Sequence, residues 1–169
     1  RNMMRTGEDF SDMYLDQGQR LAAMTVAAGQ HSILLTGVPG TGKSMFARRL
    51  ISLMPQMSGH EHLTSLELHN LIYDDLPPSL LNGAPPFRSP HHQASVQAIL
   101  GTTDIPGEMS LAHGGLLFLD ELPEFRRDLI ESMRQPMESG MIHLARAQRK
   151  VRWPARTMLI AAANHCPCG

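Results

Sequence analysis

A short glycine-rich segment matches the pattern G-x-x-x-x-G-K-[ST] at every position. Its residues are Gly37, Val38, Pro39, Gly40, Thr41, Gly42, Lys43 and Ser44. Glycines let the backbone curl so that successive N–H groups face phosphate oxygens, at the positive end of a following helix. Lys43 is expected to reach the β- and γ-phosphates of a nucleoside triphosphate, and the Ser44 hydroxyl is expected to ligate Mg²⁺. We interpret the segment as a phosphate-binding loop, or P-loop, rather than a chance glycine turn.

Two adjacent acids, Asp120 and Glu121, directly follow the apolar run 116–119. A buried strand of this kind delivers a carboxylate to the edge of a sheet. Asp120 is expected to hold Mg²⁺ through its water shell, and Glu121 to polarise the attacking water as general base. The alternative is an acidic helix start, because Asp and Glu favour that position. The P-loop earlier in the chain favours the catalytic interpretation.

A polar amide, Asn164, ends a third apolar run at 157–163. We expect it to orient the attacking water or to contact the γ-phosphate, which makes it a third candidate catalytic residue with Lys43 and Glu121. Asn also ends strands through ordinary turn chemistry. The two preceding motifs favour the functional interpretation.

The elements that must position these residues alternate along the chain. Strands are predicted at 32–36, 116–119 and 157–163, and helices at 17–28, 44–54 and 125–138. This alternation predicts a three-layer α/β/α domain with a parallel sheet covered on both faces. We expect the strand before Gly37 at the centre of the sheet, flanked by the strands that end at Asp120 and Asn164, with all three motifs at one edge.

Three segments lie outside this alternation. Thr64 and Glu67 form a capping-box pattern that predicts a helix start. Residues 76–112 begin with a proline-rich stretch without periodicity and are interpreted as an insertion. Residues 141–156 alternate like two strands and predict a β-hairpin. All of them belong to one domain, 1–169.

The composition narrows the class of protein. No apolar run approaches the ~18 residues that a membrane-spanning helix needs, and there is no signal-peptide pattern. We therefore expect a cytoplasmic protein with no membrane partner. The net charge of −1 argues neither for nor against nucleic acid, but five of the 15 basic residues lie between positions 146 and 156.

The order of these motifs resembles that of AAA+ ATPases with a helix-2 insertion and a hairpin before the strand that ends in Asn164. Four segments look like those of the magnesium-chelatase-related ATPases of the competence-associated (ComM-like) branch: FRSPHH at 87–92, GEMSLAH at 107–113, LDELPEF at 119–125 and NHCPCG at 164–169. Residues 16–19 resemble the family segment near the adenine. Two departures are His165, where the family usually has proline, and residues 101–106, which lack the family's extra glycines.

The resemblance implies a ring-forming motor, a homo-hexamer in the full-length protein, that binds ATP and Mg²⁺ and hydrolyses ATP. In the competence-associated branch the implied partner is DNA, single-stranded or branched, and no small-molecule substrate other than ATP is expected. The family's helical lid, its sensor arginine and the arginine offered to the neighbouring subunit lie beyond Asn164. The chain is thus expected to be a fragment and nearly inactive alone.

The basic hairpin has two interpretations that stay open. The resemblance places its tip, Arg149 and Lys150, in the central pore of a ring, where cations contact a phosphate backbone. The cluster is equally well explained as a solvated turn, or as arginines that pair with a neighbouring subunit.

Other functions were weighed against the DNA motor. An ATPase subunit that drives Mg²⁺ insertion into a porphyrin is the main alternative, and residues 87–92 and 166–168 make it less favourable. A non-hydrolysing assembly module is opposed by Glu121 and Asn164. A GTPase is excluded, because no N-K-x-D motif accompanies the D-x-x-G at 104–107.

Two pairs of potential metal ligands are given structural interpretations. Cys166 and Cys168 are too close for an ordinary disulfide, and two ligands do not make a zinc site, so we interpret them as free thiols. His91 and His92 are adjacent, and their side chains would point in different directions in an extended segment. We therefore favour a structural role for both in the insertion.

Overall fold

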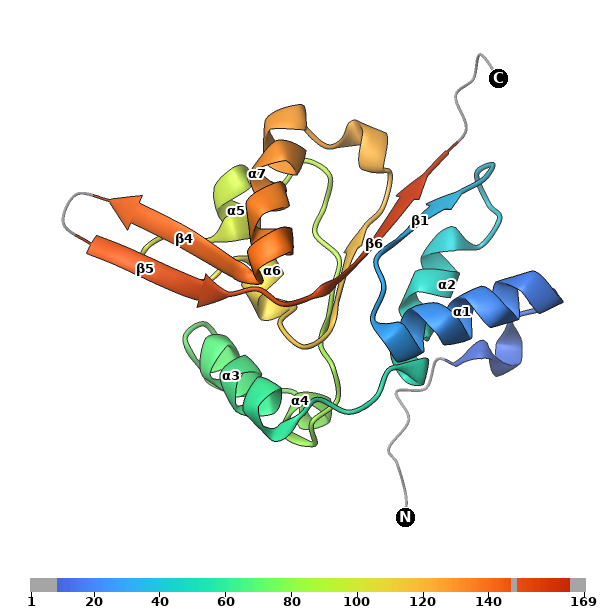
Figure 1. Cartoon of the computed structure of the whole chain (residues 1–169), viewed down its shortest axis with the longest axis horizontal. Helices are drawn as coiled ribbons and strands as arrows, with labels where there is room; N and C mark the ends of the chain where they lie inside the picture. Colours follow the sequence, from blue (N-terminus) through green and yellow to red (C-terminus); the bar gives the residue numbers. More distant parts are fainter. Residues whose placement is uncertain (1–8, 147–148, 165–169) are drawn as a thin grey trace.

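A four-stranded parallel sheet forms the centre of the molecule in a computed structural model that describes residues 9–146 and 149–164 (Figure 1). Its strands, in spatial order, are β1 (Ile33–Thr36), β6 (Met158–Ala163), β3 (Leu116–Leu119) and β2 (Phe87–Arg88). A separate antiparallel hairpin, β4 (Met141–Arg146) with β5 (Arg149–Pro154), extends away from this sheet. The predicted parallel sheet and the predicted hairpin are both confirmed.

The strand order corrects one prediction, since β1 does not lie at the centre. β6 hydrogen-bonds to both β1 and β3, and β1 is an edge strand of the described sheet. Burial agrees, because β6 is mostly buried whereas Leu34 of β1 is 53% exposed. The apolar run before Gly37 was correctly predicted as a strand, but an apolar run does not specify which strands pair with it.

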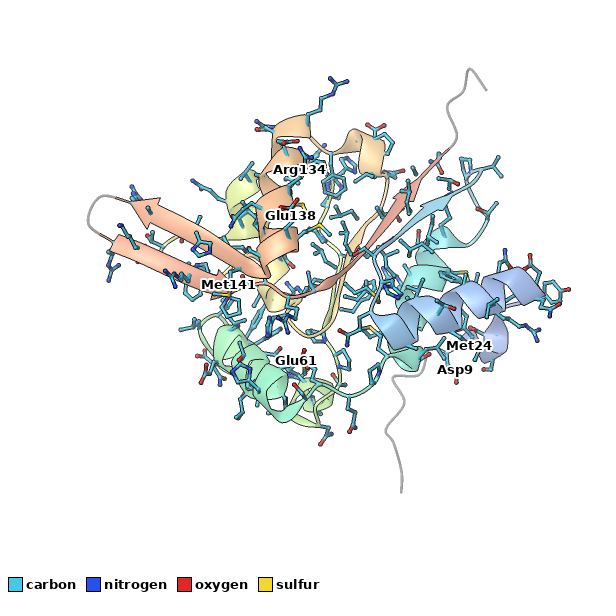
Figure 2. All side chains as sticks on the ribbon, in the orientation of Figure 1. Asp9, Met24, Glu61, Arg134, Glu138 and Met141 are labelled. Atoms are coloured by element: carbon cyan, nitrogen blue, oxygen red, sulfur yellow. The ribbon has the colours of Figure 1, made fainter. Side chains whose placement is uncertain are left out.

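The two faces of the sheet carry separate apolar cores. Consecutive residues of a strand point to opposite faces, and β3 shows this clearly. Leu116 and Phe118 pack with the first helices of the chain, whereas Leu117 and Leu119 pack with helices of the insertion and the helix that follows β3. Side chains thus fill the space on both sides of the sheet (Figure 2), as a three-layer α/β/α domain requires.

The chain contains four longer helices in its described part. In chain order they are α1 (Gln17–Gly29), α2 (Lys43–Leu50), α3 (Gly59–Asn70) and α7 (Arg127–Ser139). The shorter helical segments are η1 (Phe10–Asp12), η2 (Ile51–Leu53), α4 (Pro78–Leu81), α5 (Val96–Leu100), α6 (Glu108–Leu111) and η3 (Leu122–Glu124). α1 and α2 cover one face, and α5, α6 and α7 cover the other.

The start of α3 corrects a second prediction. The helix begins after Ser58, whose side chain and that of Glu61 (labelled in Figure 2) form the capping box. Thr64 lies inside the helix, one turn after its start. Both pairs fit the S/T-x-x-E pattern. The earlier pair, Ser58 and Glu61, forms the cap because it satisfies the first free N–H groups of a longer helix.

The insertion is ordered and supplies a strand that the sequence did not predict. β2 contains two residues, Phe87 and Arg88, and pairs with β3. Two residues are too few for a period to be recognised. Arg88 donates to both carboxylate oxygens of Glu108 at 2.6 and 2.7 Å, and this half-buried carboxylate raises the pKa of Arg88 above its usual value. The ion pair ties β2 to α6.

Candidate active site

The glycine-rich loop lies where β1 ends and α2 begins. Gly40 and Gly42 have φ angles of 81° and 83°, in the left-handed region that side chains rarely adopt. Gly42 is also the N-cap of α2. The Gly37 N–H donates to the Ala163 carbonyl at 3.3 Å, so the loop starts beside the last residue of β6. The loop therefore brings backbone N–H groups to a helix N-terminus at one edge of the sheet.

Lys43 connects the loop to the end of β6. Its ammonium group donates to the carbonyls of Gly37 (2.9 Å) and Val38 (3.0 Å) and to Asn164 Oδ1 (2.9 Å). A lysine has three N–H donors, and all three are engaged. Asn164 is exposed at the end of β6. Two of the residues selected from the sequence are thus in direct contact although 121 positions separate them.

Ser44 and Asp120 form the second contact between motifs. The Ser44 hydroxyl donates to Asp120 Oδ2 at 2.6 Å, and the bond is partly buried. Both groups offer oxygen ligands of the kind that Mg²⁺ prefers, and Mg²⁺ is usually held by one or two protein oxygens together with substrate phosphates and water. No group of three or more His, Cys, Asp or Glu that could hold a metal occurs among the described residues. This pair fits Mg²⁺ in that limited sense.

Glu121 lies on a tight turn directly after β3. It has a φ of 55°, in the left-handed region that is uncommon for residues other than glycine. Its N–H donates to Asp120 Oδ1 at 3.0 Å, and its carbonyl accepts from Glu124 N at 2.8 Å. Its side chain is 53% exposed and lies 3.5 Å from His92, between Oε2 and Nδ1. Backbone strain of this kind is frequent at functional sites.

His92 is a neighbour of the site that sequence reasoning placed elsewhere. It was interpreted as a structural residue of the insertion with a ring that points away from His91. The two rings instead lie 4.1 Å apart between centroids. The residues form a turn rather than an extended segment, since Ala94 N donates to the His91 carbonyl at 2.9 Å. A histidine pair soon after a short strand gave no signal that it would reach Glu121.

The segment predicted to lie near the adenine forms the start of α1. Asp16 and Gln19 make a capping box, each side chain accepting from the other residue's backbone N–H. Just before it, Met13 reaches the loop, since a Cβ built on Gly42 would lie 3.1 Å from the Met13 Cε. The segment is therefore close to the glycine-rich loop, while its predicted contact with the base stays a prediction.

Among the described residues, the basic hairpin forms no hydrogen bond or ion pair with the glycine-rich loop or with the acids after β3. Arg149 pairs with Asp104 of the insertion (Nη1–Oδ1 2.5 Å), and the two side chains are 74% and 58% exposed. Lys150 is exposed as well, and within residues 9–146 and 149–164 it has no ion pair. Behind the tip, Trp153 Nε1 donates to the Thr102 carbonyl at 2.7 Å. The hairpin is thus joined to the insertion.

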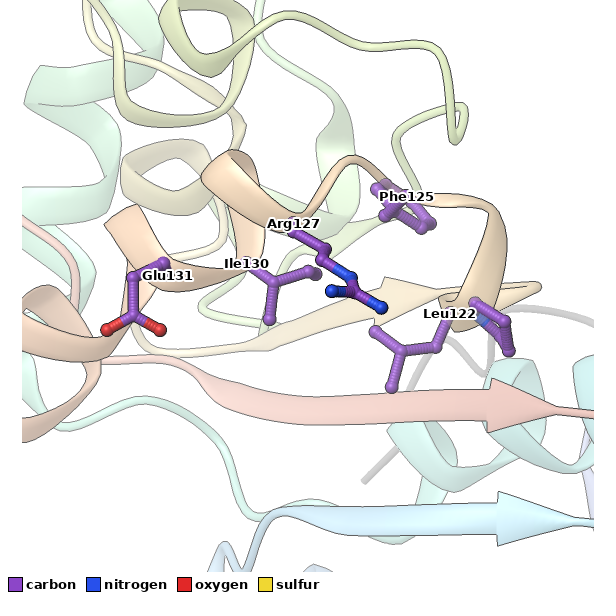
Figure 3. Close-up of a pocket in the computed structure, with 6 residues that line it drawn as sticks. Leu122, Phe125, Arg127, Ile130 and Glu131 are labelled. Atoms are coloured by element: carbon purple, nitrogen blue, oxygen red, sulfur yellow. The ribbon is translucent and has the colours of Figure 1, made fainter.

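A surface hollow adjoins Glu121 but contains none of the predicted site residues (Figure 3). It lies beside η3 and the first turns of α7. Apolar and charged side chains line it: Leu122, Pro123, Phe125, Arg127, Ile130 and Glu131. The nucleotide-binding expectation therefore depends on the loop and the strand ends, which lie outside this hollow. Cys166, Cys168 and His165 lie outside the described residues.

None of the helices in the described part of the chain is long and apolar enough to span a bilayer.

Comparison with known proteins places these features in a family. The family model described as "Magnesium chelatase, subunit ChlI" matches residues 9–169. A Salmonella typhimurium protein called "Uncharacterized protein YifB" is 49% identical over 156 residues, covering 91% of this chain and 30% of that protein. The "Competence protein ComM" of Haemophilus influenzae is 45% identical over 164 residues, covering 95% of this chain and 32% of that protein. The chain thus spans about a third of the length of these relatives.

Solved structures agree on the fold. The complex between subunits BchI and BchD of magnesium chelatase contains a match with a TM-score of 0.63 and 22% identity, covering 86% of this chain and 51% of that one. NtrX from Brucella abortus, solved in complex with ATP, matches with a TM-score of 0.60 and 18% identity, covering 88% of this chain and 30% of that one. The chain has the α/β fold of AAA+ ATPases and belongs to the magnesium chelatase family.

Proposed function

We propose that this chain is the ATP-binding and ATP-hydrolysing core of a ring-forming AAA+ motor that acts on DNA. One observation carries the ATPase part. Asp120 and Asn164 follow two parallel strands, Lys43 and Ser44 begin the helix after a third, and the four residues meet through two direct hydrogen bonds at one edge of the sheet. The proposal treats residues 1–169 as one nucleotide-binding domain, with the insertion at 76–112 and the hairpin at 141–156.

Each residue has a role that its position supports. The N–H groups of Gly37 to Ser44 bind phosphate oxygens, and the Lys43 ammonium neutralises the β- and γ-phosphates. Ser44 through its hydroxyl and Asp120 through its carboxylate would hold Mg²⁺, which would supply positive charge near the phosphates.

Hydrolysis needs a base and a group that orients water. Glu121 accepts a proton from the attacking water as the γ-phosphate is transferred to the water oxygen, which leaves ADP and phosphate. Asn164 orients the water or contacts the γ-phosphate, and its present bond to Lys43 keeps its amide beside the loop.

The proposed action on DNA has two supporting observations. It is supported by the 45% identity to a protein named as a competence protein and by the exposed Arg149 and Lys150 at the hairpin tip. The full-length protein would act as a homo-hexamer in the cytoplasm. The family description favours one alternative, an ATPase subunit of a porphyrin magnesium chelatase.

The test is ATP hydrolysis by the full-length protein, measured alone, with single-stranded or branched DNA, and with a porphyrin. We expect turnover that DNA stimulates and that Lys43→Ala abolishes. Turnover that ignores DNA but responds to the porphyrin would support the chelatase alternative. Turnover that survives Lys43→Ala would contradict the proposed site itself.

A further inference from the structure

The insertion reaches the proposed general base through one side chain, His92. This residue follows β2 by four positions, and its Nδ1 lies 3.5 Å from Glu121 Oε2. A carboxylate oxygen only accepts hydrogen bonds, so a hydrogen bond between the two groups requires a proton on Nδ1. At 3.5 Å the two atoms are within ion-pair distance and do not form a hydrogen bond. Catalytic hydrogen bonds are often this long before substrate binds.

Several contacts hold the His92 ring in place. It lies 4.1 Å from the His91 ring, with planes tilted by 38°, and 6.5 Å from the Phe125 ring, with planes at 83°. His91 is itself restrained, because its Nδ1 accepts from Gln93 N at 3.2 Å. Phe125 is buried in the core cluster that also contains Leu117 and Leu119. Ring contacts on two sides therefore restrict the His92 ring, and its Nδ1 lies near Glu121.

The Glu121 side chain has much less support of its own. Its backbone is fixed by bonds to Asp120 and Glu124, but its carboxylate is half exposed. Within the described part of the chain, His92 is the one side chain that forms an ion pair with it. An exposed carboxylate samples several rotamers, and a base contributes only from those that reach the attacking water.

We propose that His92 is a positioning residue for Glu121: its Nδ1–H binds one carboxylate oxygen and leaves the other free to accept the proton from water. This proposal rests on the proposed function. His92 neither binds nucleotide nor takes the proton, so it acts only through the orientation of Glu121. Because His92 belongs to the insertion, the placement of that segment after β2 sets the orientation of the base.

The atom involved makes the test specific. In His92→Asn the amide nitrogen occupies nearly the position of Nδ1, whereas in His92→Gln it lies one bond further out. His92→Phe keeps a ring that can stack on Phe125 but removes the N–H. His91→Phe is the matched control. It keeps an aromatic ring beside His92 and changes a residue that forms no ion pair with Glu121 in the described part of the chain.

The variants are compared in the full-length protein by steady-state ATP hydrolysis and by binding of a fluorescent ATP analogue. A displaced catalytic group costs about 10- to 100-fold, and we expect a loss of this size in kcat for His92→Phe and His92→Ala. KM and the affinity for the analogue should stay near the parent values. His92→Asn should restore more of kcat than His92→Gln, and His91→Phe should resemble the parent.

A readout without turnover uses protein labelled with ¹⁵N-histidine and no nucleotide. The His92 ring resonances should move in Glu121→Gln and stay in place in Glu124→Gln, a neighbouring exposed acid. In the Glu121→Gln background, His92→Phe should cause no further loss of turnover.

The outcomes separate this proposal from the proposed function. If Glu121→Gln hydrolyses ATP like the parent, the proposed function fails. If Glu121→Gln stops turnover while His92→Phe matches the parent, only the positioning role is overturned. It is also overturned if His92→Phe loses nucleotide affinity together with kcat, or if Asn restores no more than Gln, because either result indicates a structural role.

Discussion

The two regions that the sequence singled out, the loop edge of the sheet and the basic hairpin, are organised in opposite ways. At the loop edge, Asp120 and Asn164 come directly after two parallel strands, and Lys43 and Ser44 lie in the first turn of α2, so the backbone determines where these residues meet. The bonds Ser44–Asp120 and Lys43–Asn164 form there. At the hairpin, long side chains extend from an exposed tip, and Arg149 pairs with Asp104 across a surface where both are largely exposed.

The difference shows which kind of site a sequence can predict. Topology fixes the backbone positions of residues at strand ends and in the first turn of a helix, so the meeting of these residues follows from topology. An exposed arginine has many rotamers, and a surface ion pair contributes little free energy. Pairing with Asp104 also lowers the net positive charge at the tip. The nucleotide site can therefore be proposed from geometry, whereas the proposed contact with DNA needs a test in the full-length protein.

The largest effect that we expect tests whether the loop edge is complete by itself. A chain of residues 1–169 should hydrolyse ATP roughly 10³–10⁵-fold more slowly than the full-length protein, because an arginine that contacts the transferred phosphate contributes about that much in related enzymes. Single-turnover hydrolysis with Mg²⁺ measures both rates. Brisk turnover by 1–169 would mean that an arginine within it, such as Arg146 or Arg156, supplies that charge.

A second effect separates binding from chemistry within the loop edge. Glu121→Gln in the full-length protein should bind ATP like the parent but lose roughly 10²–10⁴-fold in turnover, because the amide cannot accept the proton. Lys43→Ala should lose binding, because it removes the charge that faces the phosphates. Calorimetric titration with ATP and a phosphate-release assay measure the two quantities. Equal loss of binding in both variants would show that Glu121 has a different role.

A third, smaller effect tests whether the hairpin end is independent of the loop edge. Gly101 has a φ of 88°, and a Cβ there would lie 2.6 Å from Gly107 N and from Ile105 O. Gly101→Ala should loosen the turn that contacts Trp153, at a cost of about 1–3 kcal/mol. Hydrogen exchange should then rise at 101–107 and in the hairpin while ATP affinity is unchanged.

The matched control for this change is Gly59→Ala, since nothing lies within 4 Å of a Cβ at Gly59. Lower ATP affinity in Gly101→Ala, but not in Gly59→Ala, would show that the two ends of the molecule are coupled.

The smallest effect concerns the charges at the hairpin tip. If Arg149 and Lys150 contact DNA phosphates, each lost cation should reduce the magnitude of the salt slope of DNA binding by about 0.7 to 0.9. Basal ATP hydrolysis should persist in Arg149→Ala/Lys150→Ala, and stimulation by DNA should fall. DNA affinity of the full-length variant across a salt series measures this. An unchanged slope with full stimulation would favour a solvated turn.

The sequence predicted features that have a local pattern and missed those that depend on tertiary contacts. Strands and glycine-rich turns carry their own local signals, so β3, the loop between β1 and α2, and the hairpin were predicted correctly. The position of β6 between β1 and β3 was not, because strand order depends on tertiary pairing that an apolar run does not specify. β2 was too short to show a period. The contact between His92 and Glu121 depends on a turn and on ring stacking, neither of which leaves a pattern in the chain.

The strand order has a consequence for folding. Among the described strands β1 pairs only with β6, and their registered residues, such as Ile33 and Ile160, are more than a hundred positions apart. During synthesis, β1 and its glycine-rich loop emerge early, but β1 cannot pair with β6 until β6 has left the ribosome. Contacts this distant in sequence slow folding, because a long loop must close before they form. A nucleotide that binds only the finished site would then stabilise the native state just as β6 is placed.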